Sequence, residues 1–274
     1  MNSKSNKVES ENLKERDREY MEWWDSIAFE YESKVLSPLY SGVKNPIWDF
    51  LGQLNTKDYK KALDLGCGTG KLLDSLSQHF EEVWGIDWSK NMLQIAESTN
   101  SSNKNVRLKR MDIRNLEIFY DYFDAIFSIN TIASYSFAAA RQMLEETFKA
   151  LRVGGLFVAI FPAFDAVLYQ RELTYEAYVE EGLAPSKATQ KADDYFVRRN
   201  KLNLKERTYA DDGVHDEKMF TEDEIPSLLQ ALGFKDIITK KVLYPWDLCK
   251  KYGYGYFPDK PEIWDWFSIA HKQL

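Results

Sequence analysis

Strand-like and helix-like segments alternate along residues 61–161, and this alternation constrains the fold more than any other feature of the sequence. Short runs rich in apolar residues are separated by segments whose apolar residues recur at helical spacing. The runs are KALDL (61–65), EVWGID (82–87), VRLKRMD (106–112), FDAIFSIN (123–130) and LFVAIF (156–161). This order predicts an α/β fold with a doubly wound, Rossmann-like sheet.

The alternation stops at residue 163 and resumes at residue 221. The segment between them, 163–220, is charged, rich in tyrosine and without a clean apolar period, so we expect an inserted lid beside the site. Within it, YADDGVHD (209–216) predicts a hairpin in which Gly213 supplies the turn.

The C-terminal part restores the regular pattern. A helix is predicted within TEDEIPSLLQALGF (221–234), where Thr221 and Glu224 have the spacing of a capping box. Two further strands, at 237–244 and 265–272, complete a seven-stranded sheet that is mostly parallel, with an antiparallel C-terminal strand. We divide the chain into an N-terminal frayed tail and helical cap (1–45), a Rossmann-like core (46–162), the lid (163–220) and the C-terminal part of the sheet (221–274).

The loop after the first strand, LDLGCGTG, places Gly66, Gly68 and Gly70 at G-x-G-x-G spacing. A dinucleotide fingerprint runs G-x-G-x-x-G and cradles a pyrophosphate at the following helix. Asp64, two residues ahead of the first glycine, would repel that dianion but would pair with an ammonium group. The loop therefore predicts a zwitterionic ligand, whose carboxylate meets the loop amides and whose ammonium group meets Asp64.

The next two strands also end in acids. Asp87 has the position at which a carboxylate accepts hydrogen bonds from ribose hydroxyls, and Trp88 offers a flat face to a purine. Asp112, at the end of the third strand, either accepts from the exocyclic amine of the base or starts a turn. Three strand-end acids without a nearby basic residue favour a ligand that carries no phosphate.

These motifs resemble a known family. LDLGCGTG, GIDWSKNML, MDI, FDAIFSIN and ALRVGGLFVAIF, in this order over roughly 60–162, resemble the consecutive motifs of class I S-adenosylmethionine-dependent methyltransferases. The likeness is greatest to the small-molecule branch, near the quinone-biosynthesis and glycine/sarcosine methyltransferases. WDSIAFEY resembles the N-terminal segment of that branch, whose tyrosine closes over the cofactor.

The resemblance implies S-adenosylmethionine as cofactor and in-line transfer of its methyl group to an N, O or C atom of a small molecule. Carried over by position, the cofactor-binding residues would be Tyr31, Asp64, Gly66, Cys67, Gly68, Gly70, Asp87, Trp88, Met92, Asp112, Ile113 and Asn130. Two alternatives stay open: a sensor or scaffold that binds the cofactor without chemistry, and a nicotinamide-dependent oxidoreductase, against which Asp64 and the glycine spacing argue.

Residues for the methyl acceptor are less well defined. Tyr20, Trp23 and Trp24 either pack a helix onto the core or line the acceptor pocket, and Tyr135 is a further candidate. His215 lies among acids that would raise its pKa, so it is either a solvated turn residue or a general base. The sequence INTIASY, after the fourth strand, differs from the run typical of enzymes that methylate nucleic acid bases.

Composition limits the remaining function classes. A net charge of −7 argues against a nucleic acid partner, although residues 186–210 carry seven basic and three acidic side chains. No metal-ligand spacing occurs, and the two cysteines are far apart. The N-terminus lacks an apolar leader, and the longest apolar run, 154–164, is too short for a bilayer, so we expect a cytoplasmic protein without a membrane partner. The acceptor and the oligomeric state are not determined by the sequence.

Overall fold

The computed structural model describes residues 2–55, 57, 59–133, 136–210 and 215–273, with side chains from residue 15 onward. Up to the fifth strand, the elements are α1 (Asn2–Ile27), a 3₁₀ turn η1 (Ala28–Glu30), α2 (Tyr31–Lys34), α3 (Pro46–Gln53), β1 (Lys61–Leu65), α4 (Leu73–His79), β2 (Glu82–Asp87), α5 (Lys90–Thr99), β3 (Val106–Arg110), η2 (Glu117–Phe119), β4 (Phe123–Ile129), α6 (Phe137–Ala150) and β5 (Leu151–Phe161). They are followed by α7 (Phe164–Glu180), α8 (Pro185–Asp193), a π-helical turn η3 (Asp194–Arg199), β6 (Thr208–Tyr209), β7 (Glu217–Lys218), α9 (Glu224–Ala231), β8 (Phe234–Tyr244), α10 (Trp246–Lys251) and β9 (Ile263–Lys272).

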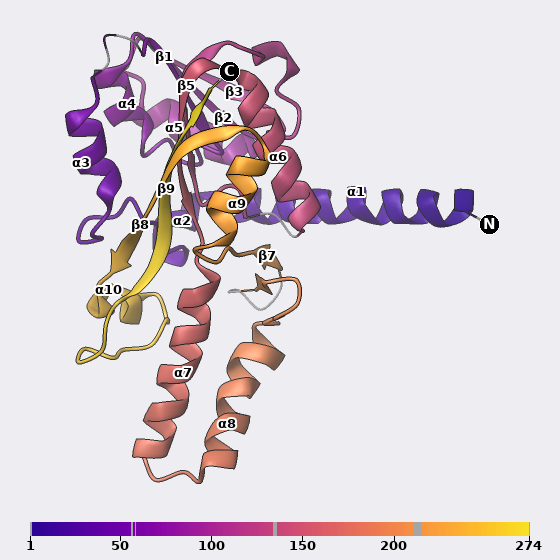
Figure 1. Cartoon of the computed structure of the whole chain (residues 1–274), viewed down its shortest axis with the longest axis vertical. Helices are drawn as coiled ribbons and strands as arrows, with labels where there is room; N and C mark the ends of the chain where they lie inside the picture. The colour runs from indigo at the N-terminus through magenta and orange to yellow at the C-terminus, as the bar shows by residue number, and fades with distance from the viewer. Residues whose placement is uncertain (1, 56, 58, 134–135, 211–214, 274) are drawn as a thin grey trace.

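Seven strands form one twisted sheet in the order β3-β2-β1-β4-β5-β9-β8. The five strands from β3 to β5 are parallel, and β9 is antiparallel to both of its neighbours. Figure 1 shows α3 and α4 on one side of this sheet and α6 and α9 on the other. The predicted α/β, doubly wound sheet with an antiparallel C-terminal strand is therefore confirmed.

The central strands form the core. Every residue of β4 from Phe123 to Ser128 is buried, which explains why this run has no alternation of polar and apolar residues. Phe127 is fully buried and packs edge-on against Phe80, which follows α4. Burying such a side chain contributes roughly 1.5–3 kcal/mol to the free energy of folding, which stabilises the central strands whose ends carry the site.

Local signals set where the helices around the site begin. Asn45 accepts a hydrogen bond from Ile47 N at 3.0 Å, with Pro46 in the first turn of α3. Ser89 caps α5 by accepting from Met92 N at 3.1 Å. α4 begins at Leu73 rather than at Gly70, because Gly70 has a φ of +80° that a helix cannot contain.

The capping box expected at Thr221 is not formed. α9 begins at Glu224 with no side-chain cap, and the Glu224 carboxylate instead pairs with Lys218 and Arg207, both at 2.9 Å. Leaving the buried Lys218 ammonium without a partner would cost more free energy than leaving the helix end uncapped.

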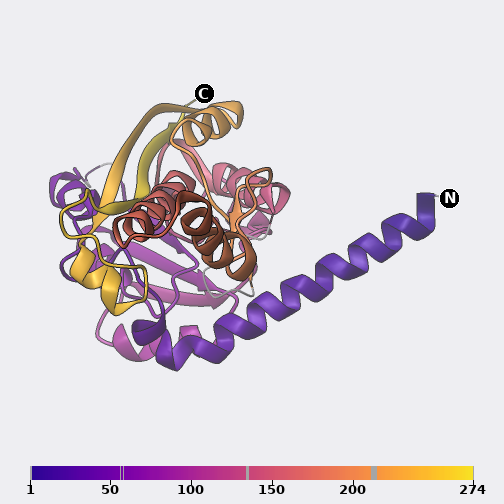
Figure 2. The same ribbon diagram turned by 90° about the horizontal axis from the view of Figure 1, so that it is seen from below.

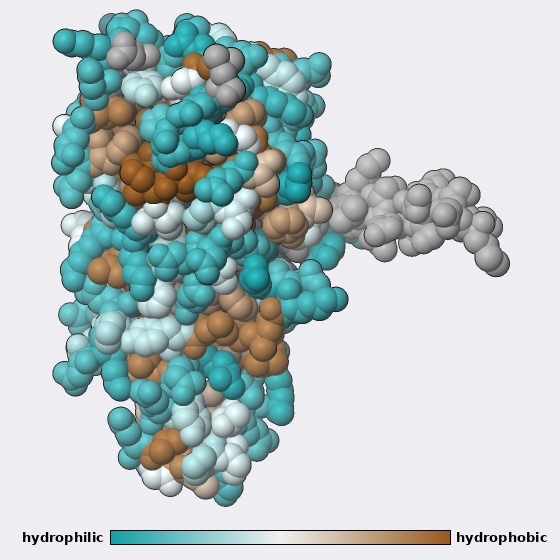
Figure 3. Space-filling view, viewed as in Figure 1, coloured by the Kyte–Doolittle hydropathy of each residue, from teal (hydrophilic) through white to brown (hydrophobic). Residues whose placement is uncertain are grey.

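The insertion after β5 is mainly helical, which its sequence did not indicate. α7 and α8 pack side by side and extend away from the sheet (Figures 1 and 2). The short β6–β7 hairpin forms where it was expected, while its predicted turn at Gly213 lies outside the described residues. The surface is largely hydrophilic, with small hydrophobic patches, including some over the α7–α8 region (Figure 3).

The N-terminal region also differs from expectation. Residues 2–15, expected to be a frayed tail, continue helix α1, which projects from the body of the molecule (Figures 1 and 2). The end of α1 is held against α5 by Asp25, which accepts from Ser89 Oγ at 2.7 Å and from Asn91 N at 2.9 Å. These bonds direct the chain that follows, η1 and α2, over the sheet edge.

Candidate functional site

A cavity of about 790 Å³ lies at the carboxyl ends of the parallel strands. The residues after β1, β2, β4 and β5 all contribute to its wall, because parallel strands deliver their ends to the same edge. Helices α1 and α2 and the α7 part of the insertion complete the wall. The volume falls within the range of small-molecule pockets, about 300–1,000 Å³.

The glycine loop forms one side of the cavity. Gly66 and Gly68 have φ angles of +63° and +52°, which glycine adopts without strain. A Cβ on Gly66 would lie 2.3 Å from Thr131 Cγ2, whereas the space in front of Gly68 is open, so its backbone faces the cavity. Cys67 also lines the cavity.

Gly70 has a different part from the one predicted. A Cβ there would lie 2.6 Å from Asn100 Nδ2 and 2.9 Å from Ala96 Cβ, so this glycine lets the loop pack against α5. Gly70 is not among the residues that line the cavity. The structure thus gives Gly70 a packing role, and its predicted contact with the ligand has no support from the cavity lining.

Asp64 is a buried carboxylate that faces the cavity. Its side chain is 2% exposed, and within the described residues its carboxylate has no hydrogen bond and no ion pair. Burial raises its pKa well above the usual value, and the nearby Asp87 adds to this. A buried acid without a partner is costly, and a cationic group of a ligand would remove that cost.

Asp87 is held in place by backbone donors. Its carboxylate accepts from Gly68 N at 3.0 Å and from Ser89 N at 2.8 Å. Burial raises its pKa to about 6, although these hydrogen bonds act in the opposite direction. Three other predicted residues, Trp88, Met92 and Ile113, line the cavity as well.

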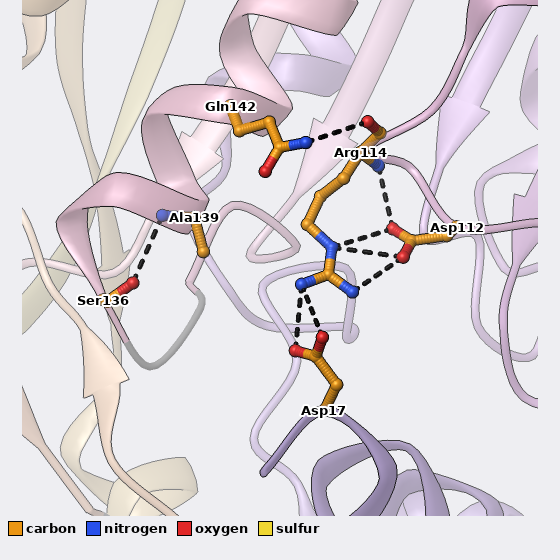
Figure 4. A network of polar contacts seen from close by, with 6 residues as sticks. All are labelled: Asp17, Asp112, Arg114, Ser136, Ala139 and Gln142. Atoms are coloured by element: carbon orange, nitrogen blue, oxygen red, sulfur yellow. Dashed lines mark hydrogen bonds and ion pairs between the residues drawn. The ribbon is translucent and has the colours of Figure 1, made fainter. Parts of the chain in front are cut away.

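Asp112 lies outside the cavity wall and starts a turn, the second of its two expected roles, by accepting from Arg114 N at 2.9 Å; the basic partner was not expected. Arg114 donates to it through Nη2 at 2.7 Å and Nε at 3.0 Å and also reaches Asp17 of α1 at 2.9 Å (Figure 4). Burial acts to raise the pKa of Asp112, but the hydrogen bonds from Arg114 hold it below its usual value. The Asp112 carboxylate, expected to be available for a ligand, is thus bound by Arg114. Together the two residues anchor α1 through Asp17.

An aromatic wall covers the cavity from the N-terminal side. Tyr20, Trp23, Trp24 and Tyr31 all line it, with Trp23 and Trp24 ring centroids 4.6 Å apart and Trp24 and Tyr31 centroids 6.2 Å apart. The His215 ring lies 4.8 Å from that of Trp23, so this histidine also lines the cavity. The two readings of the tryptophans are thus compatible: the rings pack on one another and face the cavity. Tyr135 lies outside the described residues.

Another part of the wall contains a polar cluster that the sequence analysis missed. Asn130 lines the cavity as predicted, and its Nδ2 donates to Asp265 Oδ2 at 2.8 Å. Tyr244 OH donates to the same oxygen at 2.5 Å, and both Tyr244 and Asp265 line the cavity. The signal was present, because Tyr244 ends one predicted strand and Asp265 starts the next, at the sheet edge where the site was expected.

Comparison with known proteins agrees with this geometry. Residues 62–155 match the model of a methyltransferase domain. With the sheet topology and the ordered motifs, this match assigns residues 62–155 to a methyltransferase domain that resembles those of class I S-adenosylmethionine-dependent methyltransferases.

Among curated proteins the chain is similar to demethylmenaquinone methyltransferases. It is 32% identical to that of Staphylococcus saprophyticus over 39% of this chain and 47% of the relative, so this match spans about half of the relative's length. It is 25% identical to that of Staphylococcus carnosus over 79% of this chain and 85% of the relative.

A solved S-adenosylmethionine-dependent methyltransferase from Methanosarcina mazei shares the fold, with a TM-score of 0.58 and 18% identity over 84% of this chain and 98% of that one. None of the helices within the described ranges combines the length and apolar character that crossing a bilayer requires.

Proposed function

We propose that this chain transfers the methyl group of S-adenosylmethionine to a small-molecule acceptor. The observation that carries the proposal is Asp64, a buried carboxylate that faces the cavity and has no partner among the described residues. Such a group suits the ammonium end of an amino-acid nucleoside and rejects a diphosphate. The family assignment gives independent support, and it argues against the nicotinamide-dependent alternative.

The cofactor fits the residues that are present. Asp64 would hold its ammonium group and Asp87 its ribose hydroxyls, while the open space at Gly68 lets the cofactor approach the loop closely. Trp88, Met92 and Ile113 offer apolar surface to the adenine. When bound, S-adenosylmethionine supplies a methyl group made electrophilic by the adjacent sulfonium.

The chain's own contribution would be alignment and exclusion of water. The aromatic wall of Tyr20, Trp23, Trp24 and Tyr31 can bury a planar acceptor against the cofactor side of the cavity. The names of the curated relatives, demethylmenaquinone methyltransferases, favour a planar ring compound over an aliphatic amine.

Methyl-labelled S-adenosylmethionine tests the proposal. The purified chain is incubated with the labelled cofactor and a deproteinised bacterial metabolite extract, and products are separated by mass. We expect label in a small-molecule product, and none with Asp64→Asn in place of the natural chain. If the chain binds the cofactor but labels nothing, it is a cofactor-binding sensor or scaffold and the proposed reaction is wrong.

A further inference from the structure

The polar cluster of Asn130, Tyr244 and Asp265 lies where three separate parts of the chain meet. Asn130 follows β4, Tyr244 ends β8 and Asp265 lies near the start of β9, so all three reach the carboxyl edge of the sheet. Tyr244 is 4% exposed and Asp265 is 9% exposed, yet both line the cavity. Burial of a carboxylate and a phenol at the wall of a cavity is costly for folding and calls for a chemical explanation.

The hydrogen bonds of this cluster all converge on Asp265 as the acceptor. Asp265 accepts from three donors: Tyr244 OH at 2.5 Å, Asn130 Nδ2 at 2.8 Å and Ala163 N at 3.2 Å. The Tyr244 hydroxyl donates to Asp265, and the Asn130 amide also interacts with the Tyr244 oxygen, which leaves that oxygen one lone pair to accept a hydrogen bond from a ligand. Within the described residues no lysine, arginine or histidine forms an ion pair with Asp265.

Two further observations mark the cluster as built for a ligand. Asn130 has a φ of +51°, a conformation uncommon for residues other than glycine, and this turn aims its amide at Asp265. The other amide atom, Asn130 Oδ1, is buried and has no hydrogen-bond partner among the residues that the structure describes. An unsatisfied buried acceptor at a cavity wall is accounted for if a bound molecule supplies the donor.

We propose that Tyr244 and Asp265 form a proton relay that activates a hydroxyl-bearing acceptor, of the phenol or enol class. This inference rests on the proposed methyl transfer and narrows its acceptor. Tyr244 is the catalytic residue, since it would touch the acceptor hydroxyl. Asp265 and Asn130 act through it as positioning residues.

The step balances in protons and electrons. The O–H bond of the acceptor breaks, and its proton moves to Tyr244 Oη while the Tyr244 proton moves to Asp265 Oδ2. The electron pair stays on the acceptor, on oxygen or on a conjugated carbon, and forms the bond to the methyl carbon as the carbon–sulfur pair leaves with sulfur. Burial raises the pKa of Asp265, which makes it a better proton acceptor than an ordinary carboxylate.

The other titratable groups facing the pair stay neutral. Tyr31 of α2 interacts electrostatically with Tyr244, and burial raises the pKa of Tyr31 far above its usual range. Cys249 of α10 lies with Sγ 3.5 Å from Tyr244 O, and burial raises its pKa to about 12. Asp64 and Asp87 also line the cavity with raised pKa values, so the part of a pH dependence that belongs to the relay is the part that Tyr244→Phe and Asp265→Asn remove.

The variants Tyr244→Phe and Asp265→Asn test the relay, with Tyr169→Phe as the matched control. Tyr169 also carries a hydrogen-bonded hydroxyl, to Pro261 O at 3.2 Å, but it does not line the cavity. The assay uses methyl-labelled S-adenosylmethionine with a deproteinised bacterial extract, and calorimetry with S-adenosylhomocysteine verifies that each variant is folded and keeps its cofactor site.

We expect label on oxygen or carbon of a hydroxyl-bearing product. Both variants should lose about 100- to 10,000-fold in transfer rate with cofactor affinity unchanged, and they should regain rate at alkaline pH where the acceptor ionises by itself. Labelled product on nitrogen, or transfer rates equal to that of Tyr169→Phe, would overturn the relay while leaving methyl transfer intact. No transfer by the natural chain would overturn both.

Discussion

Among single residues, Asp64 most strongly restricts which ligand the cavity can bind. It is buried, faces the cavity and has no partner within the described residues, so its main use would be to bind a cation. In a protein without ligand such a carboxylate reduces stability, because burial disfavours its charged form. Binding and stability should thus respond to this residue in opposite directions.

Replacing Asp64 by Asn separates these two effects. We expect the affinity for S-adenosylhomocysteine to fall about 100-fold, or about 2.7 kcal/mol, while the ligand-free variant melts no lower than the natural chain. Titration calorimetry and thermal unfolding measure the two quantities, and Asp74→Asn, an exposed change on α4, is the control. Affinity within threefold of the natural chain would show that Asp64 does not hold the ammonium group.

Asp87 should give the ligand-free protein a characteristic pH dependence. The folded chain holds this proton up to about pH 6, whereas the unfolded chain releases it near 3.8. The contribution of Asp87 to stability is therefore complete below pH 3.8 and is lost as the pH rises through 6.

Asp87→Asn does not titrate, so the difference in unfolding free energy between variant and natural chain should change by roughly 2–3 kcal/mol between pH 4 and pH 7. Denaturant unfolding at several pH values measures it. A difference that stays constant with pH would mean that the pKa of Asp87 is not raised.

At the scale of elements, helix α1 is attached to the core by a few polar contacts. Asp25 bonds to Ser89 and Asn91 at the start of α5, and Asp17 meets Arg114 after β3. These contacts fix the position of the aromatic wall. Loosening them should therefore change how well the cavity is covered.

Asp25→Ala removes the attachment to α5. We expect backbone amides of residues 18–27 to exchange about tenfold faster, a loss of about 1.4 kcal/mol, because two charge-assisted hydrogen bonds disappear. Exchange followed by mass spectrometry measures this. Glu22→Ala is the control and should change little, because Glu22 is an exposed acid of the same helix that pairs with Arg18 at 3.7 Å. Equal exchange in both variants would contradict the attachment.

The insertion provides the second element-scale prediction. Ala166, Val167, Gln170 and Tyr195 of this insertion line the cavity, so a bound ligand would contact them. We expect amides of 164–199 to gain protection when S-adenosylhomocysteine and acceptor bind. Hydrogen exchange with and without ligand tests this, and equal protection would rule out a lid that closes on the ligand.

The elements that could be predicted from the sequence are those whose signal is local. β1, β2 and β4 were expected within a residue of their observed bounds, because their buried faces leave continuous apolar runs. The helical insertion was not expected, because its helices bury few residues and have no strong apolar stripe. A helical cap was expected within residues 1–45, but the continuation of α1 through residues 2–15 was not.

The residues of the site likewise divide into those that could be predicted from the sequence and those that could not. The side facing Asp64, Gly68 and Asp87 could be predicted, since one strand-loop-helix unit and its neighbour supply it. Tyr244 and Asp265 were missed because their meeting with Asn130 depends on the pairing of β5, β9 and β8. For Asp112 the turn alternative agrees with the structure, and its ion pair with Arg114, two positions further on, was not expected.

At the scale of the whole molecule, one cavity joins four stretches of chain: the N-terminal cap, the ends of β1 to β5, the insertion and the β8–β9 edge. A ligand that contacts all of them stabilises the folded state as a unit, by about 2.7 kcal/mol at a concentration of 100 times its Kd. The sign of the charge along the cavity decides which ligand that is.

Titration calorimetry with two ligands tests this most directly. S-adenosylhomocysteine and NADH are each titrated into the natural chain at neutral pH. The carboxylates of Asp64 and Asp87 predict saturable, one-to-one binding of S-adenosylhomocysteine and no binding heat from NADH. Tight binding of NADH, together with no binding of S-adenosylhomocysteine, would contradict the assignment of the cavity to S-adenosylmethionine.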